Sequence, residues 1–248
     1  MSVLLVDIGN TRVKWARFAK GRLQKQRAAA HAGWQAQHFA AELMGQAQGI
    51  ERVIVASVGG AQLDRRLTAA ARREIGVAPQ FVLTTRRLGG VTTAYAQPWR
   101  LGVDRFVAAI AAHHMARRRA VCVVDIGTAM TIDLIDAHGS HVGGAIIPGP
   151  RLMTESLLRS TSGILHRSGG KARGRSLFAR DTRAAIEQGA LYAAAAVVDR
   201  AVAEARRALG VSPLVLLTGG AAPSIHPLIR STHSSVPDLV LRGLVALI

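Results

Sequence analysis

Two short stretches of this sequence place a carboxylate, a glycine and a threonine in the same order. Asp7-Ile8-Gly9-Asn10-Thr11 follows the apolar run 3–6, and Asp125-Ile126-Gly127-Thr128 follows the apolar run 121–124. A carboxylate at a strand end can hold a cation or its waters, and the next glycine lets backbone N–H groups approach a phosphate. The threonines add hydroxyl donors, and Lys14 adds a positive charge. Two such turns predict phosphate binding by two related domains that face each other across a cleft.

A second candidate site is Gly102-Val103-Asp104-Arg105, which opens a predicted helix. Aspartate at a helix start is commonly only a cap, and that alternative stays open. The irregular segment before it, residues 85–103, is long enough to favour a functional loop that brings Asp104 and Arg105 to a cleft edge. A helix N-terminus favours an ionised carboxylate, so Asp104 could accept a proton from a substrate hydroxyl. Arg105 offers a planar fork for a substrate carboxylate.

A third turn, Thr218-Gly219-Gly220-Ala221, follows the apolar run 214–217. Small residues there leave room for a flat ring such as adenine, although many strand-to-helix turns look alike. Other chemistry is not indicated: the sequence has no Walker P-loop and no serine nucleophile elbow. His113 and His114 are adjacent on a predicted helix and cannot share one face, so they do not predict a metal site.

The elements that must position these residues follow from the apolar periodicity. In the first half we expect strands at 2–7, 13–18 and 23–29, a helix at 34–47, a strand at 52–57, a helix at 61–75, a strand at 80–84 and, after the loop, a helix at 104–119.

The second half repeats this order. We expect strands at 121–125, 131–136 and 141–147, a helix at 150–159, a mobile and basic loop or lid at 163–180, a helix at 182–209, a strand at 214–217, a short helix and a strand near 238–241. The pattern predicts an α/β protein of two duplicated domains, residues 1–118 and 119–248, each carrying one phosphate hairpin.

Composition narrows the class of protein. The chain has 248 residues, 49% of them hydrophobic, which suits one large domain or two small ones. No apolar run approaches the roughly 18 residues of a membrane span, and Asp7 interrupts the region where an export signal would lie. Cys122 is the only cysteine and lies in an apolar run, so we expect a small core residue in a reducing cytoplasm.

The formal net charge of +17 invites a nucleic-acid interpretation. Most of the basic residues are arginines spread along the whole chain, without stacking aromatics between them. We therefore consider nucleic acid an unlikely partner, while the same field would attract anionic small molecules such as nucleotides.

The ordered set of motifs resembles the type III pantothenate kinase family, which belongs to the acetate and sugar kinase, chaperone and actin superfamily. The resemblance covers nearly the whole chain and rests on Asp7–Thr11 with Lys14, Leu101–Arg105, Asp125–Ala129 with Thr131 and Asp133, Gly143–Gly149, and Thr218–Gly220. It implies two ribonuclease H-like (actin-like ATPase) domains with a nucleotide cleft between them. It also implies ATP-dependent phosphorylation of pantothenate, the first step towards coenzyme A.

The resemblance assigns roles residue by residue. Asp104 would be the general base, and Asp125 would hold a monovalent cation, potassium or ammonium. The ATP-binding residues would be Asp7, Ile8, Gly9, Asn10, Thr11, Arg12, Val13, Lys14 and Thr128. The pantothenate-binding residues would be Tyr95, Gly102, Val103, Asp104, Arg105 and Thr182. Magnesium would accompany ATP, and the helix that begins at Thr182 would contribute to a homodimer interface.

Two alternatives remain. One is another phosphotransferase of the superfamily, such as a sugar kinase, or a polyphosphate hydrolase. The other is a DNA-binding transcriptional accessory factor, which the positive charge keeps open although no helix-turn-helix is recognisable.

Overall fold

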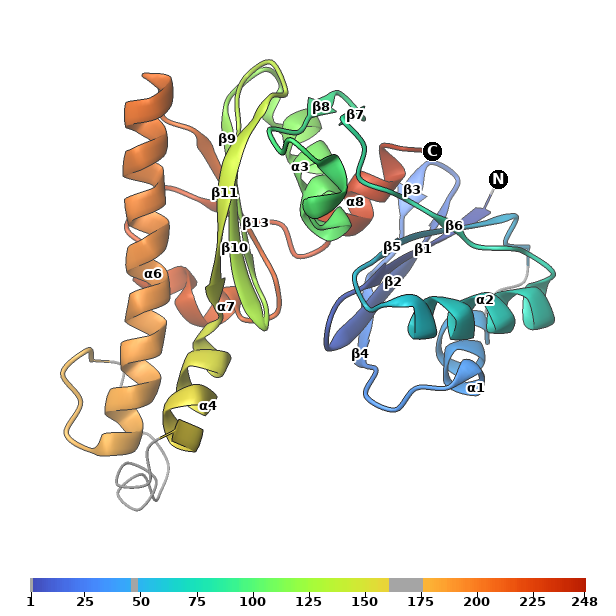
Figure 1. Ribbon diagram of the computed structural model, residues 1–248, viewed down its shortest axis with the longest axis horizontal. Coiled ribbons are helices and arrows are strands. Elements are labelled where there is room, and N and C mark those ends of the chain that lie inside the picture. Colours follow the sequence, from blue (N-terminus) through green and yellow to red (C-terminus); the bar gives the residue numbers. More distant parts are fainter. Residues whose placement is uncertain (1, 46–48, 161–175) are drawn as a thin grey trace. The chain divides into compact units, whose positions relative to one another are not determined.

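The computed structural model describes residues 2–45, 49–160 and 176–248, which pack into two compact units (Figure 1). The first unit is the chain up to Arg117 together with Gly139–His141 and Asp238–Ile248. The second unit is Arg118–His138 and Val142–Pro237. These units are defined by packing within the structure. The predicted domains, 1–118 and 119–248, are instead two halves of the sequence that share a pattern, and they stay a prediction.

The first unit is built around a sheet whose central strand is the one that delivers Asp7. In the described part of the chain this sheet has six strands, with β1 between β2 and β5. Its strands are β1 (Ser2–Ile8), β2 (Arg12–Ala19), β3 (Arg22–Leu23), β4 (Arg27–Ala30), β5 (Arg52–Ser57) and β6 (Gln80–Phe81). Every residue of β1 is buried, as expected for an apolar strand that is covered on both faces.

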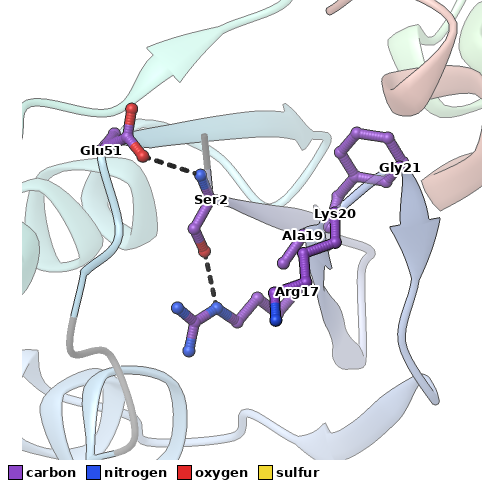
Figure 2. A pocket seen from close by; sticks show the side chains of 7 residues that line it. Ser2, Arg17, Ala19, Lys20, Gly21 and Glu51 are labelled. Atoms are coloured by element: carbon purple, nitrogen blue, oxygen red, sulfur yellow. Dashed lines mark hydrogen bonds between the residues drawn. The ribbon is translucent and has the colours of Figure 1, made fainter.

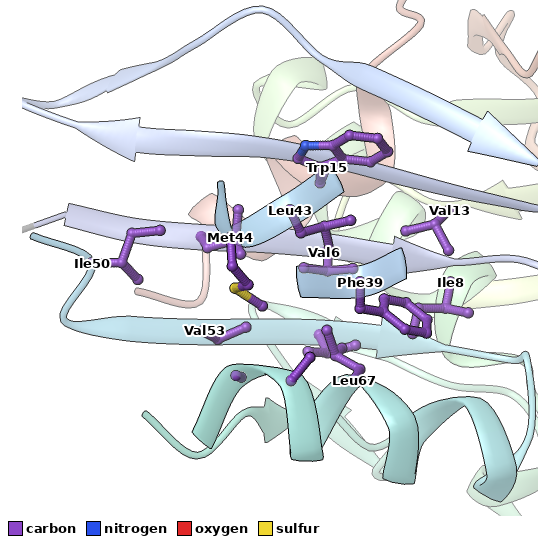
Figure 3. Close-up of a cluster of buried hydrophobic side chains, with 14 of the residues drawn as sticks. Val6, Ile8, Val13, Trp15, Phe39, Leu43, Met44, Ile50, Val53 and Leu67 are labelled. Atoms are coloured by element: carbon purple, nitrogen blue, oxygen red, sulfur yellow. The ribbon is translucent and has the colours of Figure 1, made fainter. Parts of the chain in front are cut away.

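Helices supply the cover on each face of this sheet. They are α1 (Ala36–Phe39), the π-helical turn η1 (Ala40–Met44), α2 (Ala61–Ile75), α3 (Val103–Ala116) and α8 (Leu239–Val245). On one face, Val6 and Ile8 of β1 pack with Phe39, Leu43 and Leu67 in a single apolar cluster (Figure 3). Burial of such side chains is the main term that holds the hairpin of β1 and β2 in place.

The segment between β6 and α3 has more structure than the predicted irregular loop. It contains a small antiparallel hairpin, β7 (Arg87–Leu88) with β8 (Val91–Thr92), and the 3-10 turn η2 (Pro98–Arg100). The short segment Gly139–His141, which leads into the strand β11 (His141–Pro148), packs with the first unit. The backbone N–H of Thr92 in β8 donates to the carbonyl of Gly139 at 2.9 Å.

The second unit has a five-stranded sheet among its described residues. Its strands are β9 (Val121–Ile126), β10 (Ala129–Ile135), β11 (His141–Pro148), β12 (Leu214–Thr218) and β13 (Ser234–Ser235). Its helices are α4 (Pro150–Ser160), α6 (Thr182–Leu209), α7 (Ala222–Ile225) and the 3-10 turn η3 (His226–Leu228). The buried stripe of α6, including Ala194 and Val198, packs on Val124 and Ile126 of β9.

The two sheets share one topology. The first runs β3-β2-β1-β5-β6 and the second β11-β10-β9-β12-β13, so the strand bearing the aspartate is central in each. It pairs antiparallel with the next strand in both cases, and parallel with β5 in the first sheet and with β12 in the second. The prediction of an α/β fold with two sheets in two domains is confirmed.

Most predicted elements are confirmed, and the ones with local end signals match best. The helices at 61–75 and 182–209 have the predicted bounds, and each is followed by a glycine with positive φ, Gly76 or Gly210. The strand at 80–84 pairs over Gln80–Phe81 only, and the helix at 34–47 is divided into α1 and η1. Most of the predicted lid at 163–180 lies outside the described residues.

One element was predicted wrongly. Residues 238–241 were expected to form a strand, whereas Leu239–Val245 is the helix α8 and the last strand is Ser234–Ser235. A short apolar run does not distinguish a strand from a buried helix. Five of the seven residues of α8 are buried, and the helix packs on α3 and β1, so tertiary contacts decided its conformation.

Cys122 is 1% exposed within β9, which confirms its interpretation as a core residue. Burial raises the pKa of its thiol to about 12, so the group stays protonated and unreactive at neutral pH. Within the described ranges, no helix combines the length and apolarity needed to cross a bilayer.

Candidate active site

The first aspartate turn lies at the end of a buried hairpin. Asp7 of β1 is directly opposite Lys14 of β2, and Lys14 Nζ lies 3.5 Å from Asp7 Oδ2. The Asp7 side chain is only 5% exposed, and a buried carboxylate of this kind needs a nearby cation to remain ionised at low cost. Lys14 therefore supports Asp7 directly, a role that the sequence did not indicate.

The turn between these strands is held closed from both sides. The backbone N–H of Gly9 donates to the carbonyl of Arg12 at 2.9 Å. His31 Nε2 donates to the carbonyl of Gly9 at 2.7 Å from a largely buried position. His31 was missed in the sequence, where it is a lone histidine between alanines that lies beside Gly9 only because β4 pairs with β2.

The predicted ATP-binding stretch separates into two kinds of residue. Asn10, Thr11 and Arg12 are exposed at the tip of the turn. Ile8 and Val13 are completely buried in the apolar cluster, so their side chains cannot touch a ligand and only their backbone could. Their part is to anchor the turn.

The second aspartate turn is surrounded by hydroxyl-bearing residues. Asp125 of β9 pairs with Thr131 of β10 on one side and with Thr218 of β12 on the other. Directly paired residues present their side chains on the same face of a sheet, so both hydroxyls flank the carboxylate. The carbonyl of Thr128 at the turn accepts a hydrogen bond from Gly149 at 2.9 Å.

The turn after β12 packs directly against Asp125. Gly219 has φ +93°, and a Cβ added there would lie within 3.0 Å of Asp125 Oδ1 and of the backbone of Ile126. The backbone N–H of Ala221 donates to the carbonyl of Ile126 at 2.9 Å. The turn that the sequence suggested for adenine is therefore also one wall of the Asp125 site.

The two aspartate turns differ in the residue that lies opposite the aspartate on the next strand, a difference that the two motifs in the sequence do not show. The position opposite Asp7 holds Lys14, whereas the position opposite Asp125 holds Thr131. Ile8 pairs with Val13 across four turn residues, but Ile126 pairs with Met130 across three, and this one-residue difference sets the register. The first site thus places an ammonium group opposite its carboxylate, and the second places a threonine there.

Asp104 lies in the first turn of α3, and Gly102 is the N-cap residue. The Oδ1 atom of Asp104 accepts from the backbone N–H of Arg105 at 2.8 Å, which is one of the N–H groups in the first turn of α3. Arg105 is 7% exposed, and its Nη1 donates to the hydroxyl of Tyr95 at 3.3 Å. The structure thus brings together a half-buried carboxylate, a buried guanidinium and a phenol.

The remaining predicted substrate residue belongs to the second unit. Thr182 is the first residue of α6 in the second unit, after Asp181, whose side chain accepts from the backbone N–H of Ala184 at 2.8 Å. Tyr95 and Gly102–Arg105 all belong to the first unit. Thr182 is thus the one predicted substrate residue that the second unit contributes.

A pocket of about 440 Å³ occurs at the end of the β1–β2 hairpin remote from Asp7 (Figure 2). It is lined by Ser2, Arg17, Phe18, Ala19, Lys20, Gly21 and Glu51. Arg17 Nε donates to Ser2 Oγ at 2.6 Å, and the Ser2 backbone N–H donates to Glu51 at 3.0 Å (Figure 2). The pocket contains no predicted site residue, so the aspartate turns remain the candidate site.

Comparison with solved structures identifies the fold. A Baf family transcriptional activator from Campylobacter jejuni superposes with a TM-score of 0.60 at 19% identity, covering 99% of this chain and 96% of that one. A ROK family glucokinase from Streptomyces griseus, solved with glucose and AMPPNP, superposes with a TM-score of 0.54 at 13% identity, covering 100% of this chain and 98% of that one. At these identities the likeness concerns the fold of actin-like ATPases and sugar kinases alone.

Comparison of sequences is more specific. The protein from Nitrosococcus oceani named type III pantothenate kinase is 38% identical over 247 residues, covering 98% of this chain and 92% of that protein. The family model described as type III pantothenate kinase matches residues 3–204, a range that contains both aspartate turns, Tyr95 and Gly102–Arg105. This chain belongs to the type III pantothenate kinase family.

Proposed function

We propose that this chain transfers the terminal phosphoryl group of ATP to pantothenate in the cytoplasm, the first step towards coenzyme A. The identity of the substrate rests on membership of the kinase family. The observation in the structure that carries the proposal is the cluster of Asp104, Arg105 and Tyr95 at the start of α3. In this cluster Asp104 is a potential proton acceptor, and the planar guanidinium of Arg105 suits the carboxylate of pantothenate.

Both aspartate turns would contribute to nucleotide binding. The exposed tip at Asn10–Arg12 and the backbone around Gly9 would contact the phosphates, together with Thr128. Asp7, held by Lys14, would bind the waters of the magnesium ion that accompanies ATP. Bound magnesium would neutralise charge that develops on the phosphates during transfer.

Asp104 would act as the general base. Its position in the first turn of α3 favours the charged carboxylate, because the helix N-terminus carries partial positive charge. Its carboxylate would accept the proton of the pantothenate hydroxyl as the oxygen attacks the terminal phosphorus. Arg105 and Tyr95 would hold the other end of the substrate. The hydroxyl would then be fixed near the terminal phosphate, which lowers the entropic cost of reaching the transition state.

Asp125 would hold the monovalent cation, potassium or ammonium. The residues present fit such an ion, because Thr131 and Thr218 flank the carboxylate and oxygen atoms are the ligands that hard cations prefer. No lysine occupies the register position that Lys14 takes in the first turn, so no ammonium group competes there from that strand.

The direct test is ATP turnover with and without pantothenate. We expect ADP release to require pantothenate and to fall by about tenfold when sodium replaces potassium, equivalent to about 1.4 kcal/mol of activation free energy. Asp125→Asn should remove the difference between the two cations. Indifference of the wild type to the cation would contradict the role of Asp125. Steeply salt-dependent binding to duplex DNA without ATP turnover would overturn the kinase assignment in favour of a DNA-binding factor.

We further propose that the protein is a homodimer and that α6 contributes to its interface. Ala185, Ala193 and Ala196 are exposed on α6 at spacings that place them on one side of the helix. Small side chains let a second helix approach closely. Sedimentation should give twice the 26.2 kDa of one chain, and Ala193→Arg should shift the mass towards one chain. A wild-type monomer at micromolar concentration would rule out this interface.

A further inference from the structure

The side chain of Arg86, just before β7, binds the main chain of the segment that carries Tyr95. Its Nη1 donates to the carbonyl of Tyr95 at 2.9 Å and to that of Thr93 at 3.3 Å, and its Nη2 donates to the carbonyl of Ala96 at 2.9 Å. The Arg86 backbone carbonyl accepts from the N–H of Thr93 at 3.0 Å. One residue therefore holds three carbonyls within a stretch of four residues.

Arginine is suited to this contact in a way that lysine is not. A guanidinium presents five N–H donors in a rigid plane, so two of its nitrogens can serve carbonyls that point in different directions. A lysine carries its donors on a single nitrogen at the end of a flexible chain and could not span Thr93 to Ala96 in the same geometry. The shape of the turn depends on the planar fork and not only on a positive charge.

Tyr95 is fixed at each of its other groups. Its backbone N–H donates to Thr93 Oγ1 at 3.2 Å, and its hydroxyl accepts from Arg105 at 3.3 Å. Its ring stacks on His141, with the ring centroids 6.0 Å apart and the planes at 29°. Thr93 and His141 are both almost completely buried, so their positions are fixed by the packing around them.

Arg86 itself is exposed, and it binds the outer, solvent-facing side of this turn. The inner side is fixed by buried groups, whereas the carbonyls of Tyr95 and Ala96 are held by the side chain of Arg86. Loss of that side chain would leave the two carbonyls to water and let the turn adopt other conformations. The stacking of Tyr95 and its contact with Arg105 would then be present for only part of the time.

We propose that Arg86 is a positioning residue for the acceptor substrate, which acts by holding the turn of Tyr95 against Arg105. The inference rests on the proposed contact of Tyr95 and Arg105 with pantothenate. If only a fraction of the molecules has the competent turn, the apparent affinity for the acceptor falls by that fraction. The nucleotide binds to other residues and should be unaffected.

The test compares Arg86→Ala and Arg86→Lys with Arg87→Ala. Arg87 is the adjacent arginine, and in the described part of the chain no hydrogen bond from its side chain is found, so it is a matched control. We expect the KM for pantothenate to rise about tenfold in both Arg86 variants, corresponding to a competent fraction of about one tenth. The KM for ATP and the midpoint of thermal unfolding should match those of Arg87→Ala.

Tyr95→Ala separates failure of this inference from failure of the site assignment. If Tyr95→Ala raises the KM for pantothenate while Arg86→Ala does not, Arg86 has no positioning role. If Tyr95→Ala leaves that KM unchanged, the assignment of Tyr95 to the substrate is wrong and the inference falls with it. Wild-type behaviour of Arg86→Lys, or an Arg86→Ala variant that only loses thermal stability, would also overturn the proposal.

Discussion

Asp104→Asn should lower kcat for pantothenate phosphorylation by about 10²–10⁴-fold, the usual contribution of a general base. An amide has nearly the shape of the carboxylate and can still accept the hydrogen bond from the Arg105 backbone N–H. The start of α3 should therefore keep its structure while the proton acceptor is lost. ATP binding, measured by equilibrium titration without pantothenate, should remain at the wild-type level because the phosphate turns are untouched.

Asp238→Asn is the matched control for Asp104→Asn. Asp238 is the N-cap residue of the helix α8 and forms an ion pair with Arg242 at 2.7 Å, but it has no assigned part in the site. Its substitution should leave kcat unchanged, which shows that the loss of one negative charge at a helix start is not itself the cause. Full activity of Asp104→Asn would remove the general-base assignment and leave Asp104 as a structural residue.

Gly219→Ala should damage the second aspartate site and the stability of the second unit. The added Cβ would collide with Asp125 Oδ1 and with the backbone of Ile126, neither of which can move without breaking β9 or its turn. Alanine is also strained at φ +93°. Overpacking of about 1–3 kcal/mol and backbone strain of about 1–2 kcal/mol should lower the unfolding midpoint by roughly 4–20 °C.

Gly220→Ala is the control for this effect, because nothing lies within 4 Å of an added Cβ and its φ is not positive. Its free energy of unfolding should change by no more than about 0.5 kcal/mol. Activation by potassium should be lost in Gly219→Ala even at temperatures where the variant is folded, since Asp125 would be displaced. A Gly219→Ala protein with wild-type melting and cation activation would show that this turn does not hold the carboxylate.

The elements that the sequence predicted well are those with signals in their own residues. The helix α6 begins after Asp181, which caps Ala184, and ends at Gly210, which adopts the left-handed conformation. The helix α8 has no side-chain cap, and its apolar run fits a strand equally well. Its helical form follows from packing against α3 and β1, which lie more than a hundred residues earlier in the chain.

The candidate site divides in the same way. The motifs around Asp7, Asp104 and Asp125 are visible as residue types and spacings, because phosphate and proton chemistry needs carboxylates, glycines and hydroxyls close together in the chain. The partners of these residues are not visible. His31 reaches Gly9 through the pairing of β4 with β2, and Arg86 reaches Tyr95 through the β7–β8 hairpin.

By itself, the sequence determined the family, the order of the strands and the carboxylates that could do chemistry, since these depend on local composition and apolar period. Only the tertiary structure decided how the two aspartates differ, with Lys14 opposite Asp7 and Thr131 opposite Asp125. The physical reason is strand register: a turn shorter by one residue changes which side chain faces the carboxylate. Such pairing depends on contacts between strands, and residue spacing within one strand does not specify it.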